Sequence, residues 1–410
     1  MNDIAGKLCF GCSACICACP QKCIQMLENS EGFLYPVIDE KKCVNCGLCR
    51  RVCPALSDVK NNEHNLNEVY AAVSKDPSVL MKSSSGGIFT ELAKQVIMEK
   101  GCVLGASFSD DFRSVHHTMA ESDAMLGNLR GSKYMQSVVG GVYPEIKKQL
   151  EAGRTVLFSG TPCQVAGLKS YLNKDYEHLF TVDIICHGVP SAKLWGCYLA
   201  DIEKKTRGKA KYVSFRYKVN DTTRLETKRL ATDGKIYYKA YSEDPFLKMF
   251  LKNDCLRESC YDCKAKENGT MADITIGDFW GIGKIKTNFD CSDGVSIIIV
   301  HTEKGKRLLK RAQPCLNIQP VDYTSAVAGN SALNMSSVRP AERDEFFVDL
   351  RRLKWHELEK KYAGEKLHTV LRRKLRSSFI GSIKRKITGR GSNDQKEALQ
   401  FGVFVVCSKL

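Results

Sequence analysis

A run of four cysteines that occurs twice near the start of the chain constrains the fold more than any other feature. Both runs have the spacing Cys-x2-Cys-x2-Cys-x3-Cys-Pro: Cys9, Cys12, Cys15, Cys19 and Pro20, then Cys43, Cys46, Cys49, Cys53 and Pro54. Zinc sites take four ligands in two pairs, not two runs of four that each end in Cys-Pro. A disulfide scaffold would be a shorter, secreted chain. The runs therefore favour thiolate-bound metal clusters.

This spacing is the one that bacterial two-cluster ferredoxins use for a pair of 4Fe-4S cubanes. A short loop delivers only three of the four thiolates, and the fourth comes from the last cysteine of the other run. One cluster is thus expected on Cys9, Cys12, Cys15 and Cys53, and the other on Cys43, Cys46, Cys49 and Cys19. Cys17 and Cys23 are left without a role. Between the runs, two apolar segments flank Glu31-Gly32 and predict a hairpin.

Composition indicates the setting. The 410 residues include 20 cysteines, and 43% are hydrophobic, so a packed core and a reducing compartment are expected. Met1 runs straight into the first cysteine loop, and no uninterrupted apolar run has the length of a bilayer span, which predicts a soluble cytoplasmic protein. The formal charge of +16 is concentrated between residues 351 and 390. Nothing indicates nucleic-acid binding.

The middle of the chain alternates between apolar strands and helices, which predicts an α/β domain with a largely parallel sheet. The expected strands are residues 69–73, 102–108, 155–159, 180–185, 272–277 and 295–300, with helices at 88–97 and 143–152 among those between them. Between residues 213 and 238 the pattern changes to period two, with Asp233-Gly234 as a hairpin turn.

A third metal site is predicted from cysteines that follow these strands. Cys163 and Cys186 lie in loops after two strands, and Cys260-x2-Cys263 supplies a ligand pair. Because loops after the strands of an open α/β sheet converge on one edge, these thiols can meet in space. Cys255 is a rival for the fourth position, and a buried apolar thiol is the alternative for Cys163 or Cys186. The cysteines assigned no ligand role are Cys102, Cys197, Cys291, Cys315 and Cys407.

At these motifs the chain resembles a known family. The motifs occur in the order Ser85-Gly86-Gly87-Ile88, Gly131-Ser132-Lys133-Tyr134-Met135-Gln136-Ser137, Gly160-Thr161-Pro162-Cys163-Gln164, Cys186-His187-Gly188-Val189-Pro190-Ser191, Cys260-Tyr261-Asp262-Cys263 and 273–281. The set is similar to the beta subunits of coenzyme F420 hydrogenases and dehydrogenases. The resemblance covers the two cysteine runs and about residues 68–300.

The resemblance implies an iron–sulfur flavoprotein with FAD and a 4Fe-4S cluster in its main domain. Carried over, Cys163, Cys186, Cys260 and Cys263 would bind the third cluster. Ser85, Gly86 and Gly87 would meet FAD phosphate or nearby atoms, with Lys133 and Thr161 close to the flavin; a plain turn and a solvated lysine are the alternatives. One departure concerns the substrate: deazaflavin-using members typically continue Cys-Met-Glu where this chain has Cys186-His187-Gly188. His187 is a catalytic candidate only by its place beside Cys186.

The last part of the chain is basic and predicted to be helical. Residues 344–361 form one expected helix, and residues 367–388 interleave Lys and Arg with apolar side chains. This segment either packs on the main domain, presents a solvated basic face, or docks peripherally to an anionic membrane surface or an acidic partner.

The sequence thus predicts an α/β fold, α+β overall. It consists of a ferredoxin-like two-cluster module (residues 1–57), an α/β FAD and 4Fe-4S domain with a mixed sheet (66–335) and a helical, basic extension (341–410). The expected function is an oxidoreductase that passes electrons from a ferredoxin or another redox partner through three 4Fe-4S clusters to FAD and an organic acceptor of unknown identity. The alternatives are an electron-relay subunit without a substrate of its own and an iron–sulfur scaffold whose tail binds a membrane assembly.

Overall fold

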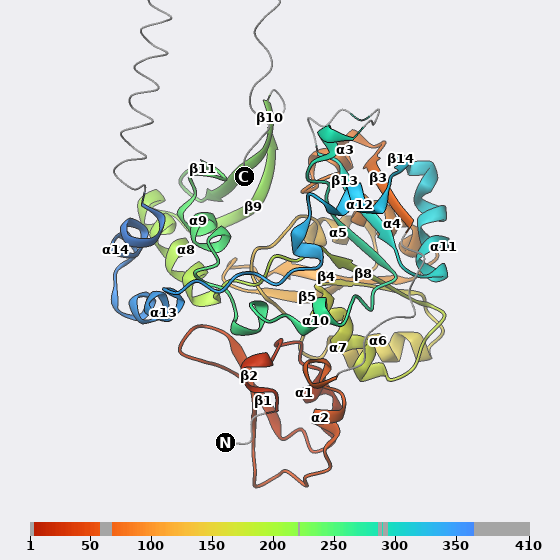
Figure 1. Cartoon of the computed structure of the whole chain (residues 1–410), viewed down its shortest axis with the longest axis horizontal. Coiled ribbons are helices and arrows are strands. Elements are labelled where there is room, and N and C mark those ends of the chain that lie inside the picture. The colour runs from red at the N-terminus through yellow and green to blue at the C-terminus, as the bar shows by residue number, and fades with distance from the viewer. Residues whose placement is uncertain (1–3, 58–67, 220–221, 286–288, 290–293, 365–410) are drawn as a thin grey trace, which may run out of the picture. The chain divides into compact units, whose positions relative to one another are not determined.

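A nine-stranded sheet is the centre of the computed structural model, which describes residues 4–57, 68–219, 222–285, 289 and 294–364 (Figure 1). Its strand order is β14-β3-β13-β12-β8-β7-β4-β5-β6. The strands are β3 (Glu68–Ser74), β4 (Cys102–Phe108), β5 (Val115–Ala120), β6 (Ser137–Val138), β7 (Val156–Gly160), β8 (Leu179–Ile184), β12 (Ile274–Asp278), β13 (Ser296–Val300) and β14 (Leu316–Pro320).

The sheet is mixed. Strands β4, β7, β8 and β12 pair in parallel at its centre. On one side β13, β3 and β14 pair antiparallel. On the other side β5 pairs antiparallel with β4 and in parallel with the short edge strand β6. The turn between β4 and β5 spans only residues 109–114, too short for the crossover that a parallel pair needs. The predicted α/β fold with a mixed sheet is confirmed, and its parallel pairs are those of the four central strands and the pair of β5 with β6 at one edge.

Two apolar cores cover the two faces of the sheet. On one face, Val103 and Leu157 join the core of α4 (Ile88–Met98), α5 (Asp123–Leu129) and α11 (Glu303–Ala312). On the other, Leu104 and Phe158 join the core of α6 (Val142–Glu151) and α7 (Pro162–Leu172). Consecutive strand residues thus enter opposite cores, as the period-two geometry of a strand requires.

The module that contains the two cysteine runs, predicted at residues 1–57, lies next to this second core (Figure 1). It contains α1 (Ala14–Ala18), the antiparallel hairpin of β1 (Ile24–Glu28) and β2 (Leu34–Ile38), and α2 (Leu48–Arg51). The predicted hairpin is therefore present. Gly167 on α7 permits close contact with the module, because a Cβ there would lie 2.9 Å from both Cβ and Sγ of Cys12.

A second, antiparallel sheet has the order β11-β10-β9, with β9 (Ala210–Val219), β10 (Thr222–Thr232) and β11 (Ile236–Ala240). The period-two pattern predicted these strands. Two helices, α8 (Ala192–Thr206) and α9 (Pro245–Leu251), lie near it (Figure 1). Shorter helices are α3 (Pro77–Met81), α10 (Lys264–Glu267) and α12 (Tyr323–Val327).

The prediction of one continuous helix at residues 344–361 is wrong, because the segment contains two separate helices. Helix α13 (Arg343–Arg352) ends before Leu353, whose backbone is extended, and α14 (Trp355–Leu358) begins after Lys354. The Glu357 carboxylate accepts a 2.9 Å hydrogen bond from the Lys354 N–H and so caps the new helix. The chain divides into two units, Met1–Tyr362 and Ala363–Leu410, and the basic segment 367–388 lies outside the described residues.

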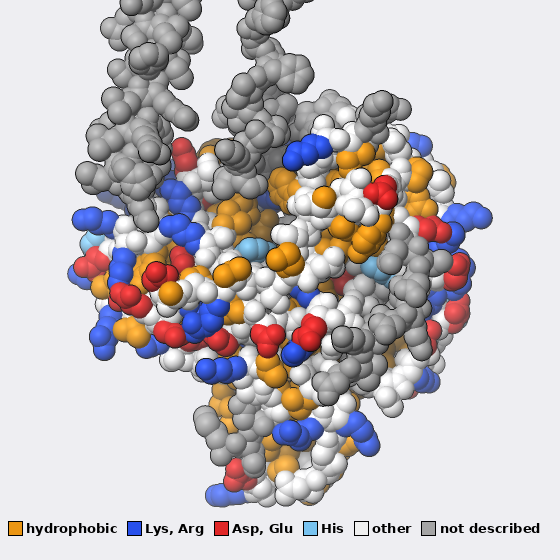
Figure 2. All heavy atoms as spheres, in the orientation of Figure 1, with side chains coloured by type: hydrophobic (Ala, Val, Ile, Leu, Met, Phe, Trp, Pro, Cys, Tyr) orange, Lys and Arg blue, Asp and Glu red, His pale blue; other side chains and the backbone are white. Residues whose placement is uncertain are grey.

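Acidic and basic side chains are interspersed over the main domain on the face that Figure 2 shows. No helix in the described ranges combines the length and the apolar character needed to span a bilayer.

Candidate functional site

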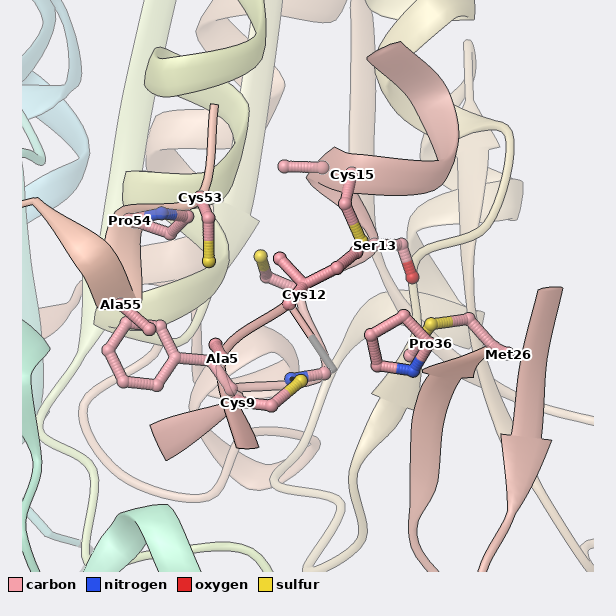
Figure 3. Close-up of a pocket in the computed structure, with 14 residues that line it drawn as sticks. Ala5, Cys9, Cys12, Ser13, Cys15, Met26, Pro36, Cys53, Pro54 and Ala55 are labelled. Atoms are coloured by element: carbon pink, nitrogen blue, oxygen red, sulfur yellow. Dashed lines mark hydrogen bonds between the residues drawn. The ribbon is translucent and has the colours of Figure 1, made fainter. Parts of the chain in front are cut away.

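Four thiols of the module surround one cavity. Cys9, Cys12, Cys15 and Cys53 line it, and Figure 3 shows their sulfur atoms directed into the same space. About 340 Å³ of this region is free of atoms, part of it open to solvent. The four come from both cysteine runs, three from the first and one from the second. This is the combination expected for one cubane, so the residues fit such a cluster.

Three of these thiols have raised pKa values. Burial first, and then the neighbouring thiols Cys9 and Cys53, raise the pKa of Cys15 to about 12. Burial likewise raises the pKa of Cys12 and of Cys53. Thiols with pKa values raised in this way stay protonated near neutral pH unless a metal stabilises their thiolates, which suits a cluster site.

The other predicted cluster set lies farther along the module. Cys49 interacts electrostatically with Cys43 and Cys46. Cys23 lies between Cys19 and Cys43. Its sulfur is 3.4 Å from that of Cys19, and it also forms a hydrogen bond with Cys43. Cys46 is exposed, unlike the thiols of the first set. Cys23, which the spacing left without a role, thus lies among the predicted ligands.

Cys163, Cys186, Cys260 and Cys263 lie together at the carboxyl ends of the parallel strands. Cys163 follows β7 and Cys186 follows β8, which are parallel neighbours. Each of the four interacts electrostatically with the other three. Burial is the main cause that raises the pKa of Cys163 to about 12 and that of Cys260 to about 11. The four thiols therefore lie close together, as their places after neighbouring parallel strands predicted.

Cys255, the rival ligand, lies elsewhere. It is buried, and its strongest electrostatic neighbours are Asp254 and Arg343. His187, the catalytic candidate, packs its ring against Phe250, and its Nε2 lies 2.6 Å from Oδ1 of Asn253. That partner fixes the ring within the protein.

Among the residues that the structure describes, no three His, Cys, Asp or Glu side chains are grouped closely enough to hold one metal ion.

The first and third thiol groups are neighbours. Cys12 interacts electrostatically with Cys163 across the contact between the module and α7. Tyr143, fully buried, interacts with both thiols and donates a 2.8 Å hydrogen bond to the Gln164 carbonyl. The two predicted cluster sites are thus separated only by packed protein interior.

The predicted flavin residues lie in two loops and one helix start. Gly86 N–H donates to Ser296 Oγ at 2.9 Å, and Ser85 Oγ donates to the Val295 carbonyl at 3.0 Å. Gly86 must be glycine, because a Cβ would lie 2.4 Å from the Ala72 carbonyl oxygen. Gly87 has a φ of +86° and directly precedes α4.

Lys133 lies beside this loop. The Ser132 N–H donates to Ser84 Oγ at 2.7 Å, which joins the two segments. The Lys133 ammonium donates to the carbonyls of Arg130 and Gly131 at 2.8 and 3.3 Å, and burial lowers its pKa to about 7. Lys133 is therefore not the solvated surface lysine that was the alternative to a place near the flavin.

Thr161 lies at the third thiol group. Its Oγ1 is 3.1 Å from Cys163 Sγ, and it caps α7 in a capping box with Gln164. Lys218, which the sequence did not single out, donates to the carbonyls of Leu80 and Ser85 at 2.6 and 2.7 Å. Its position in a strand with a period-two pattern did not indicate that it would contact the Ser85–Gly87 loop.

Comparison with known proteins places these features in a family. The model for the C terminus of the coenzyme F420 hydrogenase/dehydrogenase beta subunit matches residues 153–324, and the model for the N terminus of the same family matches 69–142. A 4Fe-4S dicluster domain matches residues 8–56. The two beta-subunit matches together cover well over half of the chain. The resemblance predicted from the motifs is confirmed.

Individual relatives are more distant. A coenzyme F420-dependent sulfite reductase of Methanocaldococcus jannaschii is 26% identical over 322 residues, 75% of this chain and 46% of that protein. An uncharacterized polyferredoxin-like protein of the same organism is 36% identical over 64 residues, 14% of this chain and 38% of that protein. The chain therefore spans less than half the length of these curated relatives.

Solved structures also match this chain. Among them is the F420-reducing [NiFe] hydrogenase complex from Methanosarcina barkeri, of which one chain is 18% identical, with a TM-score of 0.45, covering 71% of this chain and 91% of that one.

Proposed function

The chain belongs to the coenzyme F420 hydrogenase/dehydrogenase beta-subunit family, and from this premise we propose that it is an iron–sulfur flavoprotein oxidoreductase. It would take single electrons at the dicluster module and deliver them through a third 4Fe-4S cluster to FAD and an organic acceptor. The clusters supply one-electron storage, and the flavin links one-electron to two-electron chemistry. Residues 8–56 match a dicluster domain, so an iron–sulfur redox role has independent support.

The observation that carries the proposal is the electrostatic interaction between Cys12 and Cys163, which places the two thiols near each other. It joins a thiol of the module to a thiol of the main domain through buried side chains. In this arrangement the protein's own residues provide the path: α7 brings Cys163 to the module, and Gly167 allows the close approach. Water is excluded because Cys12 and Tyr143 are buried there.

The same geometry indicates which residues would hold the three clusters and FAD. Cys9, Cys12, Cys15 and Cys53 would hold the first cluster, Cys19, Cys43, Cys46 and Cys49 the second, and Cys163, Cys186, Cys260 and Cys263 the third. The Ser85–Gly87 loop and Lys133 would bind the FAD diphosphate, because the loop precedes a helix and the ammonium adds a half-buried positive charge beside it. Thr161 would orient Cys163 through its hydroxyl.

The exposed Cys46 makes the second cluster the proposed entry point for electrons from a partner protein. The organic acceptor is open. The name of one relative refers to coenzyme F420, and the chain has Cys186-His187-Gly188 where deazaflavin-using members typically have Cys-Met-Glu. Coenzyme F420 is therefore one acceptor to test among others.

Anaerobic purification and chemical reconstitution test this function. About twelve irons, twelve sulfides and one FAD per chain are expected, at four irons per cubane. Eight irons without flavin would contradict it and favour a relay subunit. Reduction of F420 and of other acceptors by the dithionite-reduced protein would then separate an enzyme from a relay.

A further inference from the structure

Arg257 is fully buried at the contact between the module and the main domain. Its Nε donates to the Cys9 carbonyl at 2.7 Å, its Nη2 to the Leu34 carbonyl at 2.9 Å, and its Nη1 to Gln136 Oε1 at 3.1 Å. The guanidinium also lies 4.2 Å from the centre of the Tyr35 ring. With all three nitrogens bonded, its charge is held in one place.

The same residue reaches the third thiol group through its backbone. The Arg257 carbonyl accepts from the Cys260 N–H at 2.9 Å, and its N–H donates to the Val189 carbonyl at 3.0 Å, in the segment that follows Cys186. Ser259 Oγ adds a second bond to the Cys9 carbonyl at 3.0 Å. One short turn therefore carries a proposed ligand of the third cluster and binds the backbone of a proposed ligand of the first.

The positive charge of Arg257 has no carboxylate partner. Within the described part of the chain, no Asp or Glu lies at ion-pair distance from it, and its acceptors are two carbonyls and one amide. A buried guanidinium without an anion is costly. Thiolate-ligated clusters on either side would supply the missing negative charge.

The charge of Arg257 acts on thiols of the third group. It lies near enough to Cys163 and Cys260 to interact electrostatically with both. A cation that stabilises thiolate also stabilises the additional negative charge of a reduced cluster on the same ligands.

We propose that Arg257 is a shared counter-charge between the first and third clusters, which raises the reduction potentials of both and fixes the contact across which electrons pass. This inference rests on the proposed function and assigns a positioning and electrostatic role to a residue outside the ligand set. The carbonyl bonds hold the module in place, and the charge favours the reduced state on either side.

The test is a redox titration of the reconstituted full chain followed by electron paramagnetic resonance, with Arg257→Gln and Arg257→Lys. At the wild-type midpoint, Arg257→Gln should lower the ratio of reduced to oxidised cluster about tenfold for two of the three clusters, as expected for one unit charge roughly 10 Å away at an effective dielectric constant near 20. A tenfold change in that ratio is a shift of about 59 mV for a one-electron couple. The midpoint of the third signal, from the Cys46 cluster, should stay in place.

Arg257→Lys retains the charge and should keep both midpoints near wild type while weakening the bonds to the module. Arg343→Gln removes another buried arginine that contacts the module, and it should leave all three midpoints unchanged. Equal shifts in Arg257→Gln and Arg343→Gln, or no shift in either, would overturn the proposal.

A second pair of variants decides the matter if Arg257→Gln fails to retain twelve irons. Gln136→Glu places an anion against the guanidinium, whereas Gln136→Met does not, and both lose the 2.7 Å bond from Gln136 Nε2 to the Phe10 carbonyl. The two midpoints should be more negative in Gln136→Glu than in Gln136→Met; identical midpoints would refute the role of the charge. The iron count of the wild-type protein, measured first, shows separately whether the third cluster of the proposed function exists.

Discussion

Arg343 binds both carboxylate oxygens of Glu31, its Nη1 and Nη2 lying 3.0 and 2.8 Å from Oε1 and Oε2, across 312 positions of sequence. Arg343 begins α13, and Glu31 lies in the turn between β1 and β2. The arginine is 2% exposed and also pairs with Glu258 at 3.1 Å. The module thus contacts the start of α13 as well as α7.

Arg343→Met should destabilise the protein strongly. It leaves the carboxylates of Glu31 and Glu258, about one fifth exposed, without their shared cation. Removal of one partner from a buried pair costs about 3–5 kcal/mol. The free energy of unfolding in urea, measured without oxygen, checks this. Arg339→Met is the control, because Arg339 is one third exposed and its pairs should contribute at most about 1 kcal/mol. Equal losses in the two variants would show that the Glu31 pair has no special weight.

Substitution of the main-domain cysteines should separate ligands from bystanders. Cys186→Ser should lose about four of twelve irons, with a matching loss of sulfide, because a cubane needs all four thiolates. Cys255→Ser should retain all twelve, since Cys255 lies beside Asp254 and Arg343 instead of the other thiols. Iron and sulfide assays after anaerobic reconstitution distinguish them. A loss of four irons from Cys255→Ser with none from Cys186→Ser would reverse the assignment.

The cysteines of the third thiol group also show how much of the site could be predicted from the sequence. That Cys163 and Cys186 come together follows from their place after neighbouring parallel strands, because such loops share an edge of the sheet. The choice between Cys186 and Cys255 could not be made, since it depends on the path of residues 255–263, which have no period to read. The roles of Arg257 and Arg343 could not be predicted either. A lone arginine looks the same in sequence whether it is solvated or buried, and burial is set by segments far away in the chain.

The close approach at Gly167 should be sensitive to a single methyl group. In Gly167→Ala the new Cβ would lie 2.8 Å from Tyr143 Oη and 2.9 Å from Cys12 Sγ, so the module or α7 must shift. We expect a loss of about 1–3 kcal/mol in unfolding free energy, typical of overpacking, together with slower electron transfer from the module to the main domain. Stopped-flow reduction monitored at the cluster and flavin absorbance bands measures the second effect. Gly196→Ala on α8 is the matched control, because nothing lies within 4 Å of a Cβ there. Identical kinetics in the two variants would count against a path through this contact.

Asp183 should make stability depend on pH. Its fully buried carboxyl accepts hydrogen bonds from the hydroxyls of Thr270 and Thr275 at 2.5 and 2.6 Å. Burial raises its pKa from 3.8 to about 7, against the effect of those bonds. Between these values the native state binds one proton more than the unfolded state, so its contribution is complete below the unfolded pKa and is lost as pH rises to the folded pKa.

The unfolding free energy of the wild type should therefore fall as pH rises towards about 7, with a slope of at most about 1.4 kcal/mol per pH unit from this group. Above that pH the contribution of Asp183 is constant. Asp183→Asn keeps the shape without the titration, so its curve should be flatter over the same range. Urea titrations between about pH 5.5 and 8 give the difference, and parallel curves for the two proteins would show that Asp183 ionises with its ordinary pKa.

Lys133 provides the last prediction, because burial brings its pKa to about 7 and its charge is therefore lost near neutral pH. If the ammonium binds the FAD diphosphate, FAD affinity should fall as pH rises through 7 in the wild type. Lys133→Met should bind FAD about tenfold more weakly at pH 6, the range expected for a hydrogen bond to a charged group, and should show no such pH dependence. Fluorescence titration of the deflavinated protein measures both. Lys147→Met is the control, since Lys147 lies on the exposed side of α6 beside Glu151. An unchanged affinity in Lys133→Met, with twelve irons retained, would place the flavin away from the Ser85–Gly87 loop and leave the cluster assignment intact.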